Sequence, residues 1–141
     1  MRAWRRERGY SRHSVTSSER DLSMSVSRPA DGSCVVSMSG ELDLDSAAEF
    51  GALLDVMTAP APVHVVVELS GVRFIDSSGL NALVVGARET ERRGGSFVVV
   101  APSHHVARVF DLVRIGESLD IVASLDDALA LTSTASEQAR S

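Results

Sequence analysis

The sequence predicts an α/β fold: a single domain with a mixed, mostly parallel β-sheet of about five strands, an N-terminal antiparallel hairpin and about four helices. Two observations support this prediction. Strand-like and helix-like segments alternate along most of the chain, which implies crossover connections between parallel strands. The two predicted strands Val63–Leu69 and Phe97–Ala101 are short and almost entirely apolar, as is typical of strands buried on both faces.

The hairpin is the first predicted element. Leu22, Met24 and Val26 alternate with polar residues, which indicates a half-buried strand. The turn sequence Pro29–Gly32 follows, and Ser33–Ser39 provides the second strand. Two such strands joined by a short turn pair antiparallel.

The first helix follows the connector Gly40–Asp43. From Ser46 the apolar residues recur with a helical period, and Pro60 and Pro62 end the helix. The predicted buried face comprises Ala47, Phe50, Leu54 and Met57.

The centre of the sheet comes next. Val63–Leu69 is a nearly continuous run of apolar, mostly β-branched residues, which predicts a strand buried on both faces. After the connector Ser70–Asp76, an amphipathic helix is predicted over Ser77–Arg93, and Gly94-Gly95 ends it. Phe97–Ala101 is another buried strand.

The last elements are shorter. Ser103 is the expected N-cap of a third helix that ends at Gly116, and a short edge strand is expected near 119–121. Ser124–Asp127 resembles a capping box, which predicts a final helix over Leu125–Leu131.

The ends of the chain differ from the body in composition. Residues 1–20 show no sustained apolar period, and a disordered extension is expected there. The alternative is a basic arm that binds a membrane or nucleic acid with the help of Trp4 and Tyr10. Residues 132–141 are small and polar and are expected to form a flexible tail, which leaves 21–131 as the domain.

The charge is also uneven. Six Arg against two Glu give the first 20 residues a net charge of +4, whereas eight Arg against 17 acidic residues give the rest −9. An acidic body repels nucleic acid and favours a basic protein partner. We therefore expect no direct binding of nucleic acid.

Length and composition exclude other classes of protein. The 141 residues suffice for one domain. The longest apolar runs are far shorter than the about 20 residues of a membrane-spanning helix. Cys34 is the single cysteine, so an internal disulfide and a structural zinc site are not expected. A reducing, cytoplasmic location follows as an expectation.

No catalytic motif was found. The sequence contains no P-loop, no G-x-G-x-x-G and no G-x-S-x-G segment. His104 and His105 are adjacent, so on a helix their side chains point about 100° apart and make a poor metal pair. His13 lies in the extension and His64 in a buried strand. We expect no enzyme activity, no metal and no cofactor.

The segment Val72–Leu80 is the main candidate for a functional site. It joins a buried strand to an amphipathic helix, and partners of such sheets meet the loops at the carboxyl ends of the strands. Asp76 or Ser77 can cap the helix, which is a purely structural explanation. However, two adjacent hydroxyls exceed what one cap requires. Gly79 in the first turn costs helix stability and is expected to leave the backbone open to another molecule.

The segment Asp76–Leu80, D-S-S-G-L, resembles the signature of the STAS domain, as found in bacterial anti-sigma factor antagonists. The resemblance extends from about Leu22 to Leu131. It includes the G-E-L-D segment at 40–43, Gly94-Gly95 and the helix residues Val106–Leu112. Several motifs occur in the right order and spacing, and the Arg-rich extension is the one departure.

The resemblance implies a partner-switching phosphoprotein. In this family the unmodified protein binds an anti-sigma factor, which is also a serine kinase, and frees a sigma factor for transcription. The kinase phosphorylates the serine before the glycine, here Ser78, with Ser77 as the alternative; a serine phosphatase reverses the modification. Asp43 matches an acidic residue implicated in the kinase contact. The residues expected to contact the partner are Asp43, Asp45, Asp76, Ser77, Gly79 and Leu80.

Two alternatives remain open. A STAS domain can serve in another assembly, such as a stressosome or a lipid-transport system. A receiver domain with Asp76 as phosphoaspartate is the second alternative. It is disfavoured because a receiver binds Mg²⁺ through acidic residues after its first strand, whereas a Pro-Gly turn follows Leu22–Arg28 here.

Overall fold

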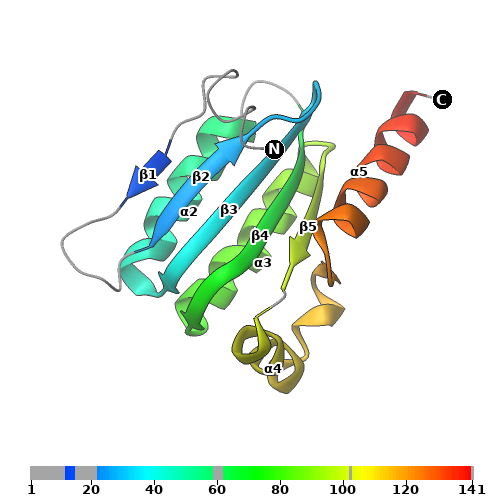
Figure 1. Cartoon of the computed structure of the whole chain (residues 1–141). Coiled ribbons are helices and arrows are strands. Elements are labelled where there is room, and N and C mark those ends of the chain that lie inside the picture. Colours follow the sequence, from blue (N-terminus) through cyan, green and yellow to red (C-terminus); the bar gives the residue numbers. More distant parts are fainter. Residues whose placement is uncertain (1–11, 15–21, 59–61, 102, 141) are drawn as a thin grey trace.

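The computed structural model describes residues 12–14, 22–58, 62–101 and 103–140. They form a six-stranded sheet whose strands follow chain order from β1 to β6, with helices on both faces (Figure 1). The elements are β1 (Arg12–Ser14), β2 (Ser23–Ser27), β3 (Ser33–Leu42), α2 (Leu44–Thr58), β4 (His64–Ile75), α3 (Ser77–Arg92), β5 (Ser96–Val100), α4 (His104–Val113), the 3₁₀ turn η1 (Ile115–Glu117), β6 (Asp120–Val122) and α5 (Leu125–Arg140).

The sheet confirms the predicted fold class. β2 pairs antiparallel with β3 as the predicted hairpin, and β3, β4, β5 and β6 run parallel. One further strand is present, because β1 pairs antiparallel with β2. Its residues, Arg12–Ser14, belong to the segment that the sequence predicts to be a disordered extension. Pairing at a sheet edge uses the backbone alone and needs no apolar alternation. The rest of the predicted 1–20 extension lies outside the described residues.

Two helix ends differ from the prediction. α5 continues to Arg140 instead of ending at Leu131, since no Gly or Pro follows to stop it. The predicted tail from 132 is therefore helical as far as Arg140, and residue 141 lies outside the described residues. α4 ends before Gly116: Arg114 adopts the left-handed conformation, with φ of 56°, and Gly116 lies within η1.

β4 is longer than predicted. It absorbs most of the expected connector Ser70–Asp76, and its second half pairs with the end of β3. The pairing shifts register twice, between Ser37 and Ser39 and between Gly40 and Glu41. Such bulges disturb the in–out alternation that identifies a strand in a sequence. Gly71 is required at the first shift, because a Cβ there would lie 2.5 Å from the Cβ of Ser39.

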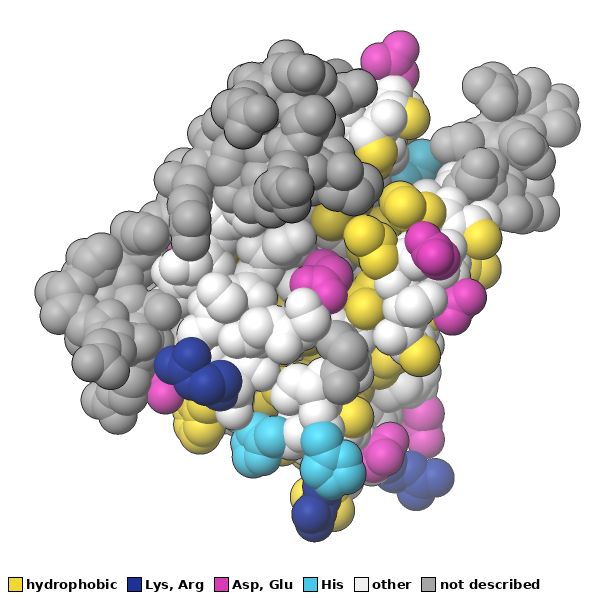
Figure 2. Space-filling view, in the orientation of Figure 1, with side chains coloured by type: hydrophobic (Ala, Val, Ile, Leu, Met, Phe, Trp, Pro, Cys, Tyr) yellow, Lys and Arg dark blue, Asp and Glu magenta, His cyan; other side chains and the backbone are white. Residues whose placement is uncertain are grey.

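The sheet lies between unequal layers. α2, α3 and α4 cover one face with a large core that includes Phe50, Leu83, Phe97 and Phe110. α5 covers part of the other face, where Ala128 packs against a smaller group of valines. Figure 2 shows this second face, with hydrophobic side chains gathered beside α5. No helix in the described part of the chain is long and apolar enough to cross a membrane.

The surroundings of Cys34 and His64 are those of residues that pack within the fold. Cys34 is buried in the main core, and its burial raises the pKa of the thiol to about 11. At neutral pH it is therefore a neutral, apolar packing group. His64 is partly buried, and its Nδ1 lies 2.7 Å from the Ser96 hydroxyl on the neighbouring strand. Neither residue lies at the strand–helix junctions that form the candidate site.

Candidate functional site

Two helix N-termini lie next to each other at the carboxyl edge of the sheet. The last residues of β3 and β4, Leu42 and Ile75, are paired in register. An aspartate follows each strand, Asp43 before α2 and Asp76 before α3. The backbone N–H of Asp76 donates to the Leu42 carbonyl oxygen at 3.3 Å, which ties the two junctions together. The residues that the sequence singled out in two distant segments thus meet at one edge.

Asp43 caps α2 through a reciprocal set of hydrogen bonds. Its Oδ1 accepts from the Ser46 N–H at 3.1 Å, and its own N–H donates to the Ser46 hydroxyl oxygen at 2.9 Å. That hydroxyl donates in turn to the Glu41 carbonyl oxygen at 2.8 Å. The helix therefore begins at Leu44 rather than at Ser46, which is buried in its first turn. The hydrogen bond from the Ser46 N–H is the main cause of a lowered pKa of the Asp43 carboxyl.

Replacing Asp43 with alanine is expected to lower the free energy of unfolding by about 1 kcal/mol at neutral pH, since α2 loses its N-cap. A carboxyl whose pKa is lower in the folded state stabilises the fold above its unfolded pKa, and this contribution disappears as the pH falls through the folded pKa. Urea denaturation at about pH 7 and about pH 3 should therefore show a smaller difference between wild type and variant at the lower pH.

Glu49→Ala is the control for this prediction. Glu49 is exposed on the same helix, beyond the first turn, and alanine suits a helix interior. Its stability should match that of the wild type. A deficit of Asp43→Ala that is the same at both pH values would show that the charge of the carboxylate does not support the helix start.

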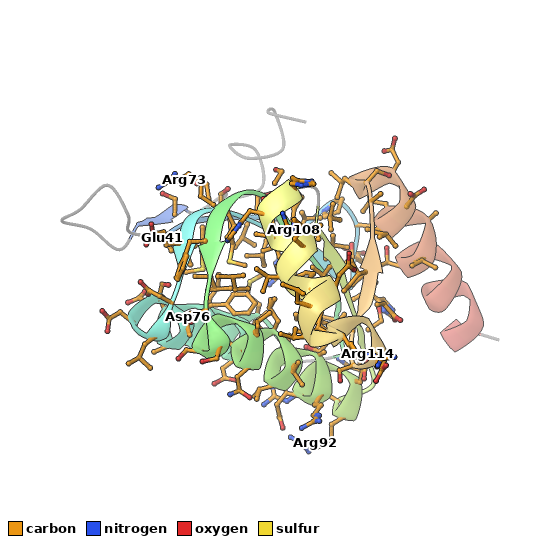
Figure 3. The ribbon with its side chains drawn as sticks, turned by 90° about the horizontal axis from the view of Figure 1, so that it is seen from below. Glu41, Arg73, Asp76, Arg92, Arg108 and Arg114 are labelled. Carbon is orange, nitrogen blue, oxygen red and sulfur yellow. The ribbon has the colours of Figure 1, made fainter. Side chains whose placement is uncertain are left out.

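Asp76 caps α3, which decides between the two predicted caps. Its Oδ1 accepts from the Gly79 N–H at 3.0 Å, and its carbonyl oxygen accepts from the Leu80 N–H at 2.9 Å. Figure 3 shows Asp76 where α3 begins. Ser77 is exposed and Ser78 is half-buried. Neither hydroxyl makes a hydrogen bond to another described residue, so neither is needed for the cap.

Gly79 has a different role from the expected one. It is buried, and a Cβ at this position would clash with the Leu42 carbonyl oxygen and lie 2.9 Å from Ile75 Cγ1. Because Gly79 has no side chain, its backbone can pack against the end of β3. The space is therefore filled by the same chain and not by another molecule. Leu80 is partly buried and packs against the main core. These two residues hold α3 in place, whereas Asp45 and Ser77 are exposed at the edge.

A groove between α2 and α3 adjoins this edge, and sequence analysis missed it. It encloses about 640 Å³. Ser78 lies in its wall, whereas Ser77 does not. Most of the lining side chains are small or apolar, and the full lining is Leu44, Ala47, Ala48, Gly51, Ala52, Leu54, Asp55, Thr58, Ser78, Asn81, Ala82, Val85, Gly86, Glu89 and Thr90. The small residues that recur along α2 could have indicated a groove beside this helix. The sequence contains no sign, however, that α2 and α3 lie next to each other.

Comparisons with known proteins agree with the fold and the motif. A family model described as "Mlab, STAS domain" matches residues 26–129. The anti-sigma-F factor antagonist RsfB of Mycobacterium tuberculosis is 34% identical over 100 residues, which cover 70% of this chain and 80% of RsfB.

Solved structures are similar as well. The crystal structure of an anti-sigma factor antagonist from Mycobacterium paratuberculosis has a TM-score of 0.72 and 30% identity, covering 83% of this chain and 98% of that one. Unphosphorylated SpoIIAA, another anti-sigma factor antagonist, has a TM-score of 0.64, covering 75% of this chain and 92% of its own. At 22% identity, SpoIIAA supports the fold alone.

Proposed function

This chain belongs to the STAS domain family, and from that membership we propose that it is an anti-sigma factor antagonist: its unphosphorylated form binds an anti-sigma factor and frees a sigma factor. The similarity to RsfB carries this proposal, since the match extends over most of both proteins. The antagonist from Mycobacterium paratuberculosis supports it at the level of the fold and the sequence.

Ser78 is the proposed switch. The anti-sigma factor acts as a serine kinase: the Ser78 Oγ attacks the γ-phosphorus of ATP, ADP leaves, and the hydroxyl proton is released. A serine phosphatase later hydrolyses the phosphoester with water. Two observations favour Ser78 over Ser77: Ser78 directly precedes Gly79, and it lines the groove that adjoins the edge, whereas Ser77 does not.

The proposed contact surface surrounds this serine. Asp43, Asp45, Asp76 and Ser77 provide its polar part at the two helix starts. Gly79 and Leu80 contribute by fixing the backbone on which Ser78 stands. The role requires no catalysis by this chain, because both chemical steps belong to partner enzymes. It places the protein in the cytoplasm, where sigma factors act.

The test begins with the unmodified full chain as bait. Mass spectrometry of the captured proteins is expected to identify an anti-sigma factor with a kinase domain. Incubation with that kinase and ATP should then add one phosphate, which Ser78→Ala abolishes and Ser77→Ala leaves intact. Phosphate labelling that persists when Ser77→Ala and Ser78→Ala are combined in one variant would rule out both serines as the phosphorylated residue. Capture of stressosome or lipid-transport subunits in place of an anti-sigma factor would support the alternative assemblies.

The receiver alternative receives no support from the site. The Asp76 carboxylate is engaged with the Gly79 N–H at 3.0 Å as the cap of α3. A phosphate on that carboxylate would displace the cap.

A further inference from the structure

We propose that the groove between α2 and α3 receives a helix of the anti-sigma factor, with basic residues along its α2 side, and that a phosphate on Ser78 blocks docking by filling one end of the groove. The inference rests on the proposed function, because it describes how the same partner binds. It adds the docking surface, the chemistry of the partner segment and the physical means of release.

The shape of the groove suits a helix. Ala48 and Ala52 of α2 are exposed in one wall, and Val85 of α3 is exposed in the other. Small side chains permit a close approach of a partner backbone, and an amphipathic helix in an apolar groove is a recurrent mode of recognition. Leu44 is 71% exposed and Val85 46% exposed. A docked helix would cover both apolar side chains.

The charges indicate which helix fits. α2 carries the exposed carboxylates Asp45, Glu49 and Asp55 and no basic residue. At the far end of the groove from Ser78, Glu89 is already paired with Arg92 at 2.8 Å. Figure 3 shows Arg92 at the opposite end of α3 from Asp76. The unpaired negative charge therefore lies along α2, and it calls for basic side chains on that side of the partner helix.

The same charges constrain how phosphorylation acts. A phosphate adds about −1.5 to −2 charge. Added negative charge beside an acidic rim strengthens the long-range attraction of a basic helix, which is the opposite of release. The phosphate must therefore act by its volume and its need for water. Ser78 lines the groove, so the added atoms occupy space that the partner helix requires.

The first test places a large side chain in the groove. Ala52→Arg is expected to weaken binding of the purified anti-sigma factor at least about 30-fold, measured by calorimetry on the unphosphorylated full chain. The matched control is Ala130→Arg, also an exposed helical alanine, but on α5 across the sheet. It should bind like the wild type, and both variants should keep the wild-type melting temperature.

The outcomes separate the two proposals. Equal or tighter binding by Ala52→Arg overturns the groove while the wild-type complex still supports the proposed function. If the wild type itself binds no anti-sigma factor, the proposed function fails first. Weaker binding in a variant whose melting temperature has fallen is resolved by hydrogen exchange of the wild-type complex: new protection of 47–55 in α2 supports the groove, and its absence overturns it.

The second test separates volume from charge. Ser78→Met adds bulk without charge and is expected to weaken binding about 30-fold or more. The control Ser118→Met changes an exposed serine that neither lines the groove nor belongs to the proposed contact surface, and its affinity should stay within about threefold of the wild type. Wild-type affinity in Ser78→Met, together with loss of binding on phosphorylation, would show that charge alone releases the partner.

The third test addresses the basic side chains of the partner. Raising the salt concentration from about 0.1 to about 1 M shortens the Debye length from about 10 to about 3 Å. Wild-type affinity should fall over this range. A double variant, Glu49→Gln with Asp55→Asn, should bind more weakly at low salt and depend less on salt. An unchanged salt dependence would contradict a basic partner helix.

Discussion

The phosphorylated protein is expected to bind its anti-sigma factor about a thousandfold more weakly than the unmodified protein, while its melting temperature changes by less than about 5 °C. An unpaired charge buried in an interface costs several kcal/mol of desolvation, and about 4 kcal/mol corresponds to a thousandfold change in affinity. Ser78 is half-buried already in the free protein, so a partner in the adjoining groove would enclose its phosphate completely.

The folded domain itself is expected to tolerate a phosphate on Ser78. Ser78 is the second residue of α3, where free N–H groups and the helix dipole favour an anion by about 0.3–1 kcal/mol. Repulsion from the Asp76 carboxylate opposes this gain. The two effects leave a small net change in stability, since a shift of 1 kcal/mol moves the melting temperature of a domain of this size by about 4 °C.

Calorimetry measures both quantities on protein phosphorylated by the cognate kinase. Ser78→Asp provides an intermediate, since it adds one negative charge and less bulk than a phosphate. Its affinity for the anti-sigma factor should lie between those of the unmodified and the phosphorylated protein. A large fall in melting temperature on phosphorylation, with affinity loss only in proportion to unfolding, would mean that the switch acts on the fold.

Gly79→Ala is expected to lower the free energy of unfolding by about 2–3 kcal/mol and the melting temperature by about 10 °C. The new methyl group meets a backbone carbonyl, that of Leu42, and the side chain of Ile75. A backbone atom at the end of a paired strand cannot rotate away as a flexible side chain can. α3 must therefore shift from β3, which weakens the packing beneath both helix starts.

Gly51→Ala is the matched control, because it makes the same substitution in the neighbouring helix. A Cβ at Gly51 meets nothing within 4 Å. Alanine is the better helix former by about 1 kcal/mol, so this variant should be more stable than the wild type. Thermal denaturation of both variants gives the comparison. If Gly79→Ala is as stable as the wild type, the strand–helix junction accommodates the added methyl group without loss of stability. Gly79 would then not be needed to hold α3 in place.

Local patterns predicted most of the fold. The apolar alternation and the turn identified the hairpin, and the continuous run Val63–Leu69 identified the centre of the sheet. Short-range hydrogen bonds were also predictable: Ser103 accepts from the Val106 N–H at 3.3 Å, and Ser124 accepts from the Asp127 N–H at 3.1 Å. Each of these features is decided by residues within a few positions of each other.

Features that depend on distant segments were missed. The second half of β4 does not show the alternation of buried and exposed residues that identifies a strand, because its pairing with β3 contains bulges. These bulges cannot be seen in the sequence of β4 alone. The sequence does not indicate what approaches the backbone of Gly79, because its close neighbour, Leu42, lies 37 positions earlier in the chain. The groove arises because Ala48 and Val85 come from helices separated by a whole strand. No local sequence pattern indicates that two such helices lie side by side.

The lengths of the outermost strands bear on how the protein behaves at high concentration. β1 and β6 have three residues each, whereas β3 and β4 at the centre have 10 and 12. A long outer strand exposes a row of unpaired N–H and C=O groups that can recruit further chains and seed aggregates. Strands this short offer little template for such growth. Edge-to-edge pairing between copies of this chain is therefore disfavoured at both ends of the sheet.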